Sequence, residues 1–501
     1  MKILVTGGSG VVGRGTVTEL LRGGHQVVLL SRHAVDDARQ WKAGVVPHTG
    51  DVCQPASIAG AATGCDLVLH MVAIVDEEPP AVTFDLVNVQ GTANIIAESE
   101  RAGVPRFVFV SSLGAPTGQS AYHESKRRAE QLVRAFAGDW TICRPGNVYG
   151  PGDEQISMLL RMVRGVTALV PTIGDGTQRF QPLWWEDAAR ALGEVCERTD
   201  LAARELDIAG AEVTSQSDLM ERFEVITGRA TRRVPIPEFL AAAGAKVISM
   251  VGWNVPLSES QLQMIREENV IPEGAENALT RVLHVAPTPL DDGLRALTEQ
   301  QPEQLPDEGI GSLRRKRFWA DIHGDQTPEG LFAYVRDHFN DVTPVFVDAL
   351  DAPGSSATIE EGASITLSLP LRGHVQVRVT GLEPTRMTLL TLQGHPLAGA
   401  VRFLCQPMGA TVRFQVEVFD RAATMLDFIA MRVLGDALQS HTWTHVVESV
   451  VEHSGGSAPE GVQHDGATLD EHEAAAINAW LEEMMLQRQR EENADRVAGA
   501  V

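Results

Sequence analysis

The alternation of apolar runs with helical stretches over the first 150 residues constrains the fold most. Segments such as GRGTVTELLRGG and VQGTANIIAESERAG have helical spacing and separate short runs rich in β-branched residues. These runs are KILVT (2–6), HQVVLLS (25–31), GVVPHTG (44–50), CDLVLHMVA (65–73), PRFVFVSS (105–112) and WTICRP (140–145). Near-continuous apolar strands separated by helices indicate a parallel sheet that is covered on both faces. The sequence therefore predicts an α/β fold with a Rossmann-type, doubly wound parallel sheet.

The pattern changes after residue 312. Five alternating runs (ASITLSLPL, HVQVRVTGL, RMTLLTLQG, AVRFLCQP and ATVRFQVEVFD) predict an antiparallel meander, and residues 422–453 predict a long amphipathic helix. This order of elements predicts an α+β domain of the helix-grip kind, in which a curved sheet holds one helix.

Shifts in composition suggest four segments. Residues 298–312 are rich in Pro, Gln and acidic residues and predict a linker, while SGGSAPEG predicts a flexible spacer before an acidic, amphipathic C-terminal helix. The expected segments are 1–297 (with a small substrate lobe from about 150), 298–312, 313–455 and 456–501. The C-terminal helix either docks on the rest of the chain or is solvated, and the sequence favours neither.

Charge and composition exclude several classes of partner. Lys and Arg total 42 against 66 Asp and Glu, and the net charge of −24 repels nucleic-acid phosphates. No window approaches the roughly 18 uninterrupted apolar residues of a membrane helix. The nearest window, 239–253, contains Lys246 and predicts a core helix, with contact at a membrane surface as the lesser alternative.

The cysteines and the N-terminus predict a cytoplasmic protein. Five cysteines are scattered without metal-binding spacing, which is typical of reduced, packed thiols. Residues 1–15 lack the pattern of a signal peptide, because the apolar run leads directly into glycines. His441 and His445 share a helix face without an acidic partner, so we expect a structural role for them and no metal site.

A glycine-rich loop follows the first predicted strand and opens a helix. The sequence TGGSGVVGR (6–14) contains Gly7, Gly8, Gly10 and Gly13. Such glycines permit a tight turn and let backbone N–H groups approach a pyrophosphate at the helix N-terminus. The strand–loop–helix context predicts a dinucleotide-binding site.

The end of the second predicted strand indicates which dinucleotide binds. An acid that accepts from the ribose 2′-hydroxyl is typical of NAD sites. Here the residues are Ser31, Arg32 and His33, with no acid before Asp36. A guanidinium pairs well with a 2′-phosphate. We therefore expect NADP(H) in preference to NAD(H), with Arg14 either assisting or solvated.

By these and further motifs, the chain resembles the extended or atypical short-chain dehydrogenases/reductases, of the NAD-dependent epimerase/dehydratase kind, over residues 1 to about 295. The matching pieces are TGGSGVVG (6–13), GDV (50–52), LHMVA (69–73), NVQGT (88–92), VSS (110–112), Tyr122-x-x-x-Lys126, RPGNVYGPGD (144–153) and GDGTQRFQPLWWEDAA (174–189). The pieces ELDIAG, VPIP and APTPLDDGL are more loosely similar to the branch that includes the NADPH-binding accessory subunit of respiratory complex I.

The resemblance implies roles for individual residues. Tyr122 would be the acid/base, Lys126 would favour its phenolate and hold the nicotinamide ribose, Ser112 would orient the substrate oxygen, and Asn147 would lie beside the substrate. Cofactor contacts are expected from Gly7, Ser9, Gly10, Val12, Gly13, Arg32, Asp51, Val52, Met71, Val72, Ala73, Tyr122 and Lys126. For Asp51, a turn aspartate is an equal alternative.

These features support one leading function and two alternatives. The leading function is an NADP(H)-dependent oxidoreductase that acts at a carbonyl or alcohol carbon of a small, apolar substrate. The alternatives are an epimerase or dehydratase acting on a sugar-like substrate, and a non-catalytic NADPH-binding protein with a lipid-binding or assembly domain. Only ten positions separate Ser112 from Tyr122, a shorter loop than in sugar-modifying members, which disfavours a nucleotide sugar.

The second half weakly resembles START-like helix-grip domains in the order of its elements. The resemblance implies an apolar ligand between sheet and helix. A homodimer mediated by helices is also open, because such dimers are common in the family that the first half resembles.

Overall fold

The computed structural model describes most of the chain. The described residues are 1–164, 169–173, 176–236, 263, 266–343, 359–369, 373–430 and 436–499. The core helix expected at 239–253 lies outside them.

The first half is built on a seven-stranded parallel sheet with the order β11-β6-β5-β4-β1-β2-β3. Its strands are β1 (Lys2–Thr6), β2 (Gln26–Ser31), β3 (Val45–Thr49), β4 (Leu67–His70), β5 (Arg106–Val110), β6 (Asp139–Pro145) and β11 (Arg204–Ile208). The first six coincide with the six predicted runs, which confirms the Rossmann-type fold. The strand order reverses between β1 and β4, and this is where a doubly wound sheet opens a crevice at the carboxyl ends of its strands.

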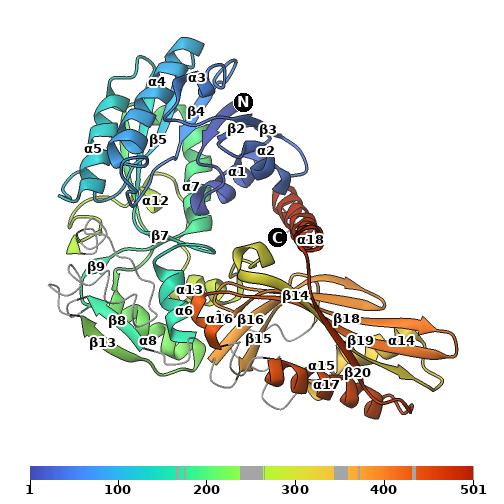
Figure 1. Cartoon of the computed structure of the whole chain (residues 1–501). Coiled ribbons are helices and arrows are strands. Elements are labelled where there is room, and N and C mark those ends of the chain that lie inside the picture. Colours follow the sequence, from blue (N-terminus) through green and yellow to red (C-terminus); the bar gives the residue numbers. More distant parts are fainter. Residues whose placement is uncertain are drawn as a thin grey trace.

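Helices cover both faces of this sheet (Figure 1). Ile3 and Val5 of β1 pack into one core cluster, and Leu4 between them packs into the other. One face carries α1 (Val11–Arg22), α7 (Trp185–Glu197) and α12 (Ala278–Arg281), and the other carries α3 (Pro55–Ile58), α4 (Gly91–Ala102) and α5 (Ala121–Arg134). Shorter connecting elements are α2 (Ala34–Asp37), η1 (Ala38–Gln40), the π-helix η2 (Asp85–Gln90) and η3 (Thr199–Leu201).

A smaller lobe follows β6 and lies below the parallel sheet in Figure 1. Its helices pack through a cluster that includes Tyr149, Leu160, Phe223 and Leu294. The lobe comprises α6 (Ile156–Arg164), α8 (Gln216–Thr227) and α13 (Leu290–Glu299), with short strands β7 (Val148–Tyr149), β8 (Leu169–Ile173), β9 (Arg179–Phe180), β10 (Leu183–Trp184), β12 (Thr214–Ser215) and β13 (Arg232–Ile236).

The second half contains a separate seven-stranded antiparallel sheet with the order β15-β16-β17-β18-β19-β14-β20. Its strands are β14 (Ile310–Ile322), β15 (Ser364–Leu369), β16 (Gly373–Glu383), β17 (Arg386–Thr391), β18 (Leu397–Met408), β19 (Thr411–Ala422) and β20 (Gln463–Thr468). The predicted meander is β15 to β19. Between the predicted spacer SGGSAPEG and the C-terminal helix, residues Gln463–Thr468 pair with β14 as an exposed edge strand, which the sequence did not predict.

Helices lie on both faces of the second sheet as well. On one face, sheet residues such as Phe403 and Val418 share a core with Val446 and Val450. The helices of this face are α14 (Pro328–Asp337), α15 (Phe339–Val342) and α17 (Asp436–His453), with α16 (Met425–Ala430) preceding α17. An antiparallel sheet packed against α17 agrees with the α+β expectation, whereas the START-like resemblance and its apolar ligand stay predictions.

The C-terminal helix α18 (Glu471–Ala498) joins the two halves (Figure 1). Leu481 is fully buried against the second sheet. Further along, Glu482 and Glu483 pair with Arg39 of η1 at 2.8 and 2.9 Å, and Asn493 donates to Gln40 O at 2.9 Å. Of the two alternatives left by the sequence, docking is therefore the one observed.

The segment between α13 and β14 is packed rather than extended. It contains η5 (Pro306–Glu308), and the buried Glu303 accepts from Arg378 at 3.1 Å and also binds Arg488 of α18. The predicted segment boundaries stay predictions, although α13 ends at Glu299 and β14 begins at Ile310, just inside the expected 298–312 linker. Among the helices in the described ranges, none is long and apolar enough to cross a membrane.

Candidate active site

The glycine-rich loop forms a cradle between β1 and α1. Gly7 has φ +74°, and a Cβ there would lie 3.0 Å from Met71 C and from Val72 N. A Cβ at Gly13 would lie 2.1 Å from the Gly7 carbonyl oxygen. Gly10 caps α1 without a side-chain hydrogen bond, so no side chain shields the first N–H groups of the helix. The cradle therefore fits the pyrophosphate of a dinucleotide.

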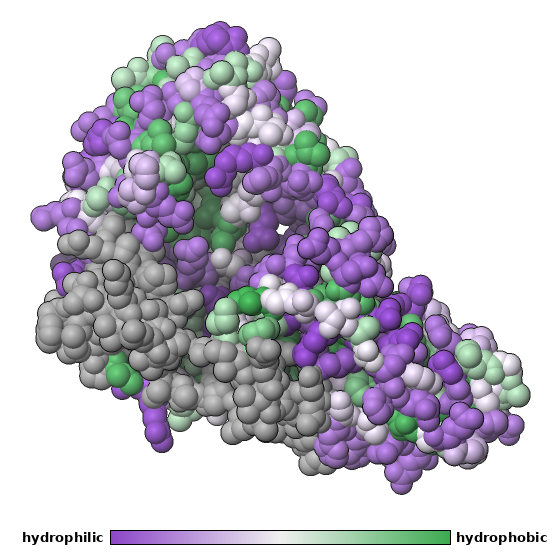
Figure 2. Space-filling view, viewed as in Figure 1, coloured by the Kyte–Doolittle hydropathy of each residue, from purple (hydrophilic) through white to green (hydrophobic). Residues whose placement is uncertain are grey.

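The expected cofactor contacts fall around this cradle. Ser9 is exposed, and Met71, Val72 and Ala73 leave β4 with partly or fully exposed side chains beside Gly7. Figure 2 shows a hollow between this body and the lower part of the molecule, with hydrophobic residues in its depth.

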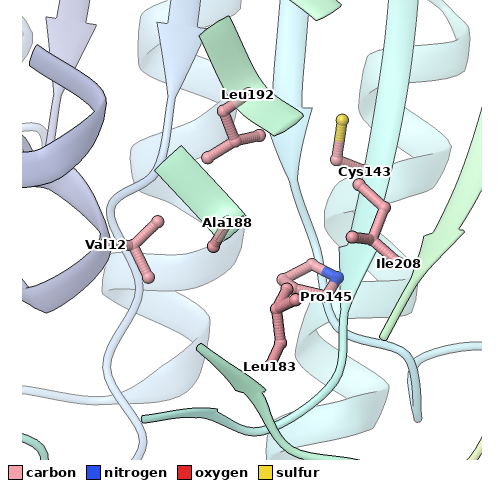
Figure 3. Close-up of a pocket in the computed structure, with 7 residues that line it drawn as sticks. All are labelled: Val12, Cys143, Pro145, Leu183, Ala188, Leu192 and Ile208. Atoms are coloured by element: carbon pink, nitrogen blue, oxygen red, sulfur yellow. The ribbon is translucent and has the colours of Figure 1, made fainter. Parts of the chain in front are cut away.

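Val12 lies in the first turn of α1, next to the glycine loop. Its side chain lines a small apolar pocket between the sheet and α7 (Figure 3). The other lining residues are Cys143, Pro145, Leu183, Ala188, Leu192 and Ile208. Val12 is half-buried, and its contact with the cofactor stays a prediction.

Arg32 and Arg14 differ in their surroundings. Arg32 follows β2 and is exposed. Its charge acts to lower the pKa of the Cys53 thiol, against the effect of burial, so Arg32 lies near the Asp51–Cys53 turn. Arg14 instead directs its guanidinium toward the carbonyl oxygen of Pro151 at 3.4 Å, and burial lowers the pKa of Arg14. The side chain of Arg14 thus lies at the junction with the lobe, and an assisting role at a 2′-phosphate stays a prediction.

Asp51 forms a local turn. Its Oδ1 accepts from Cys53 N at 2.8 Å, and its own N–H donates to Ser57 Oγ at 2.9 Å. Val52 is buried beside the start of α4. A Cβ added at Gly91 would lie 2.9 Å from the side chain of Val52. The turn aspartate is thus observed, and a contact between Asp51 and adenine stays a prediction.

Ser112 and Tyr122 meet where β5 leads into α5. Ser112 is buried two residues beyond β5, and Tyr122 lies in the first turn of α5. Burial raises the pKa of Tyr122 to about 12, and a hydrogen bond with the Ser112 hydroxyl acts in the opposite direction. The Tyr122 ring lies edge-on to Phe84, with 6.0 Å between centroids. The two predicted catalytic hydroxyls are thus brought together.

Lys126 lies one turn further along α5 and is 1% exposed. Its Nζ donates to Val110 O at 2.7 Å and lies 4.4 Å from the centroid of the Phe109 ring. Burial lowers the pKa of Lys126 to about 7. We expected its charge to lower the pKa of Tyr122, but in this structure burial of Tyr122 outweighs any such effect.

Two buried polar side chains form hydrogen bonds next to this site. Neither of them was assigned a role from the sequence. Asn88 donates to Ile74 O at 3.2 Å and to Ser125 Oγ at 3.0 Å, and Ser125 in turn donates to Tyr122 O at 2.6 Å. The motif NVQGT (88–92) was the available signal.

His70 is the second of these groups. It is fully buried at the end of β4, with hydrogen bonds to Thr6 at 2.6 Å and Thr92 at 3.1 Å. Burial, with the charge of Lys126, lowers the pKa of His70 to about 3, so the imidazole is neutral. Through these two hydrogen bonds, His70 connects Thr6 at the end of β1 to Thr92 of α4.

Asn147 lies in the wall of the lobe. Its Nδ2 donates to Gln155 Oε1 at 2.9 Å, and its Oδ1 accepts from Asn269 Nδ2 at 2.6 Å. The sequence did not single out Asn269, because it lies more than a hundred residues away with no recognisable motif. Whether Asn147 touches substrate stays a prediction.

Comparison with known proteins gives the family. Residues 3–209 match the NAD dependent epimerase/dehydratase family. "Ceramide reductase" of Caulobacter vibrioides is 30% identical over 249 residues, which are 49% of this chain and 77% of the relative. "2-alkyl-3-oxoalkanoate reductase" of Stenotrophomonas maltophilia is 31% identical over 214 residues, which are 38% of this chain and 64% of the relative.

A third relative bears on the looser resemblance noted in the sequence. "NADH-ubiquinone oxidoreductase 40 kDa subunit, mitochondrial" of Neurospora crassa is 24% identical over 277 residues, which are 54% of this chain and 72% of that protein. Together with the cradle and the Ser112–Tyr122 pair, the family match confirms the resemblance drawn from the motifs: the chain belongs to the NAD dependent epimerase/dehydratase family of NAD(P)-dependent enzymes.

Proposed function

We propose that this protein is an NADP(H)-dependent oxidoreductase that transfers hydride at a carbonyl or alcohol carbon of a small, apolar substrate. The observation that carries the proposal is the pairing of the Ser112 and Tyr122 hydroxyls, in which Ser112 is buried and Tyr122 is half-buried. An acid/base side chain within hydrogen-bond reach of an orienting donor is the arrangement that carbonyl reduction needs.

The residues divide the chemistry between them. The nicotinamide cofactor supplies or accepts the hydride. Ser112 donates to the substrate oxygen and orients the carbonyl. Tyr122, whose pKa is raised to about 12, is protonated at neutral pH and can give its proton to that oxygen as negative charge develops. When a carbonyl is reduced, this phenol is therefore the group that would protonate the substrate oxygen.

The relatives support an apolar substrate. By their names, two of them reduce ceramide and 2-alkyl-3-oxoalkanoate. The short Ser112–Tyr122 loop and the hydrophobic depth of the hollow agree with such a molecule. An apolar ligand in the C-terminal domain, a homodimer and a cytoplasmic location remain predictions from the sequence.

Two other functions keep specific support. The family description favours an epimerase or dehydratase, which would recycle its cofactor without net consumption. The likeness to the 40 kDa subunit favours a non-catalytic cofactor-binding protein. Net oxidation of NADPH with a carbonyl probe distinguishes the proposed function from both.

The exposed Arg32 should set the choice of cofactor. We expect NADPH to bind at least tenfold more tightly than NADH, because a charge-assisted contact to the 2′-phosphate is worth about 1.5–3 kcal/mol. Replacing Arg32 by Asp should abolish this preference. Titration of nicotinamide fluorescence measures both affinities, and Arg22→Asp, at an exposed residue paired with Glu19, is the control. Equal binding of both cofactors to the wild type would contradict the assignment to NADP(H).

Lys126 should make cofactor binding pH-dependent. Because burial holds the pKa of Lys126 at about 7, its ammonium is lost as pH rises through that value. If the ammonium binds the nicotinamide ribose, affinity for NADPH should fall about tenfold between about pH 6 and about pH 8. The same titration of Lys126→Met should show a much flatter profile. A flat profile in the wild type would remove Lys126 from cofactor binding.

A further inference from the structure

Glu267 links the substrate lobe to the start of the catalytic helix. Its Oε1 accepts from the backbone N–H groups of Gln119 and Ser120, both at 2.6 Å. Its Oε2 accepts from Ser120 Oγ at 3.1 Å and also contacts His123 Nδ1. The carboxylate thus binds four donors that all belong to the end of the loop before α5 or to its first turn. Leaving these four donors without an acceptor would cost free energy.

His123 is the buried partner of this carboxylate. Its side chain is only 4% exposed, against 16% for Glu267. A Cβ at Gly118 would lie 2.3 Å from His123 Nδ1 and 2.7 Å from Glu267 Oε2, so this glycine lets the loop close over the pair. Burial lowers the pKa of His123, which leaves a neutral imidazole that donates its Nδ1–H to Glu267.

The residues that Glu267 contacts lie just before and just after Tyr122 in the chain. Ser120 is the N-cap of α5, and the His123 ring lies 5.2 Å from the Tyr122 ring, centroid to centroid. Arg127, on α5 itself, holds the same loop by donating to Ala115 O at 3.0 Å and to Gly118 O at 2.9 Å. Glu267 holds the end of this loop through the backbone N–H groups of Gln119 and Ser120.

The segment that carries Glu267 is fixed in the lobe. Asn269 N donates to Arg179 O at 3.2 Å, and Gln181 N donates to Asn269 O at 2.9 Å. The side chain of Asn269 donates to Asn147, the residue expected beside the substrate. One short segment therefore touches both the proposed substrate wall and the catalytic helix.

We propose that Glu267 is a positioning residue, through which the substrate lobe holds the 113–120 loop and the first turn of α5 so that Tyr122 stays beside Ser112. This inference rests on the proposed catalytic role of Tyr122. Small displacements of a reacting group are costly, since a shift of about 1 Å can lower the rate about a hundredfold.

The test uses three variants of the full chain. Glu267→Leu removes every acceptor, whereas Glu267→Gln keeps one oxygen for the two backbone N–H groups. Glu268→Leu is the matched control, because Glu268 is 56% exposed and pairs only at 3.4 Å with Arg179. Hydrogen exchange followed by mass spectrometry reports the N–H groups of Gln119 and Ser120, and steady-state kinetics with NADPH and a long-chain 3-oxo ester give kcat and KM.

In Glu267→Leu we expect faster exchange confined to the peptide spanning 113–124, a kcat lower by roughly tenfold to a hundredfold, and unchanged affinity for NADPH. Glu267→Gln should recover most of the kcat, and Glu268→Leu should match the wild type. Wild-type exchange and kcat in Glu267→Leu would overturn the proposal, as would faster exchange spread over the whole parallel sheet. If Tyr122→Phe retains full turnover, the proposed function fails instead, and the exchange data still decide whether Glu267 holds the loop.

Discussion

Replacing Tyr122 by phenylalanine should lower turnover by about 10²–10⁴-fold and leave the affinity for NADPH unchanged. The substitution removes only the hydroxyl that is hydrogen-bonded to Ser112, and the ring keeps its edge-on contact with Phe84. Removal of the proton donor therefore acts on the chemical step and not on the cradle. The measurement is kcat with NADPH and a carbonyl probe, together with a fluorescence titration of the cofactor.

The control is the same change at another tyrosine. Tyr334→Phe alters a ring of the second domain, which stacks on His338 with 4.3 Å between centroids. It should leave turnover at the wild-type level. Equal activity of wild type and Tyr122→Phe would contradict acid/base catalysis by Tyr122, and a parallel loss of cofactor binding would mean that the tyrosine serves mainly the cradle.

Replacing Glu303 by leucine should destabilise the junction between the halves by about 3–5 kcal/mol. Glu303 is buried and pairs with Arg378 of β16 and Arg488 of α18, so its loss leaves two buried guanidinium groups without this carboxylate. Denaturant unfolding followed by tryptophan fluorescence measures the effect.

The control for this prediction is a pair at the surface. Asp465→Asn breaks a pair with Arg317 in which both side chains are more than a third exposed, and it should cost no more than about 1 kcal/mol. Equal stability of Glu303→Leu and wild type would show that the junction does not depend on this network.

The same network predicts a dependence on pH. Burial alone would raise the pKa of Glu303, but Arg378 and Arg488 hold it below its ordinary value. A lowered carboxyl pKa gives stability that is present above the unfolded pKa and is lost as pH falls through the folded pKa. The difference in stability between wild type and Glu303→Leu should therefore shrink in acid.

Local patterns predicted the first half well. The apolar runs that became β1, β2, β4, β5 and β6 are largely buried, so their composition identifies them, whereas β3 is an edge strand that is mostly exposed. The cradle was equally clear, because its glycines satisfy a local steric demand at Gly7 and Gly13. Ser112, Tyr122 and Lys126 followed from a family motif on adjacent elements.

Long-range contacts were not predictable in this way. Arg14 stands in the first turn of α1, yet its guanidinium reaches Pro151, 137 positions away. Residues Gln463–Thr468 have no apolar pattern typical of a strand, and they become one by pairing with β14. Glu267 carries no motif at all. Its role depends on which segment of the lobe lies against α5, and that is a property of the folded chain.

Transfer of the label from NADPH that carries deuterium in both hydrogen positions at the nicotinamide C4 tests the central claim most directly. The purified full-length protein would be incubated with this cofactor and a long-chain 3-oxo ester, and the product would be analysed by mass spectrometry. The proposed function predicts one deuterium on the new alcohol carbon for each NADPH oxidised, and transfer that is about 10²–10⁴-fold slower with Tyr122→Phe. A protein that binds the cofactor but leaves it unoxidised, with no deuterium in any carbonyl probe, would contradict the oxidoreductase assignment and favour an epimerase or a cofactor-binding protein.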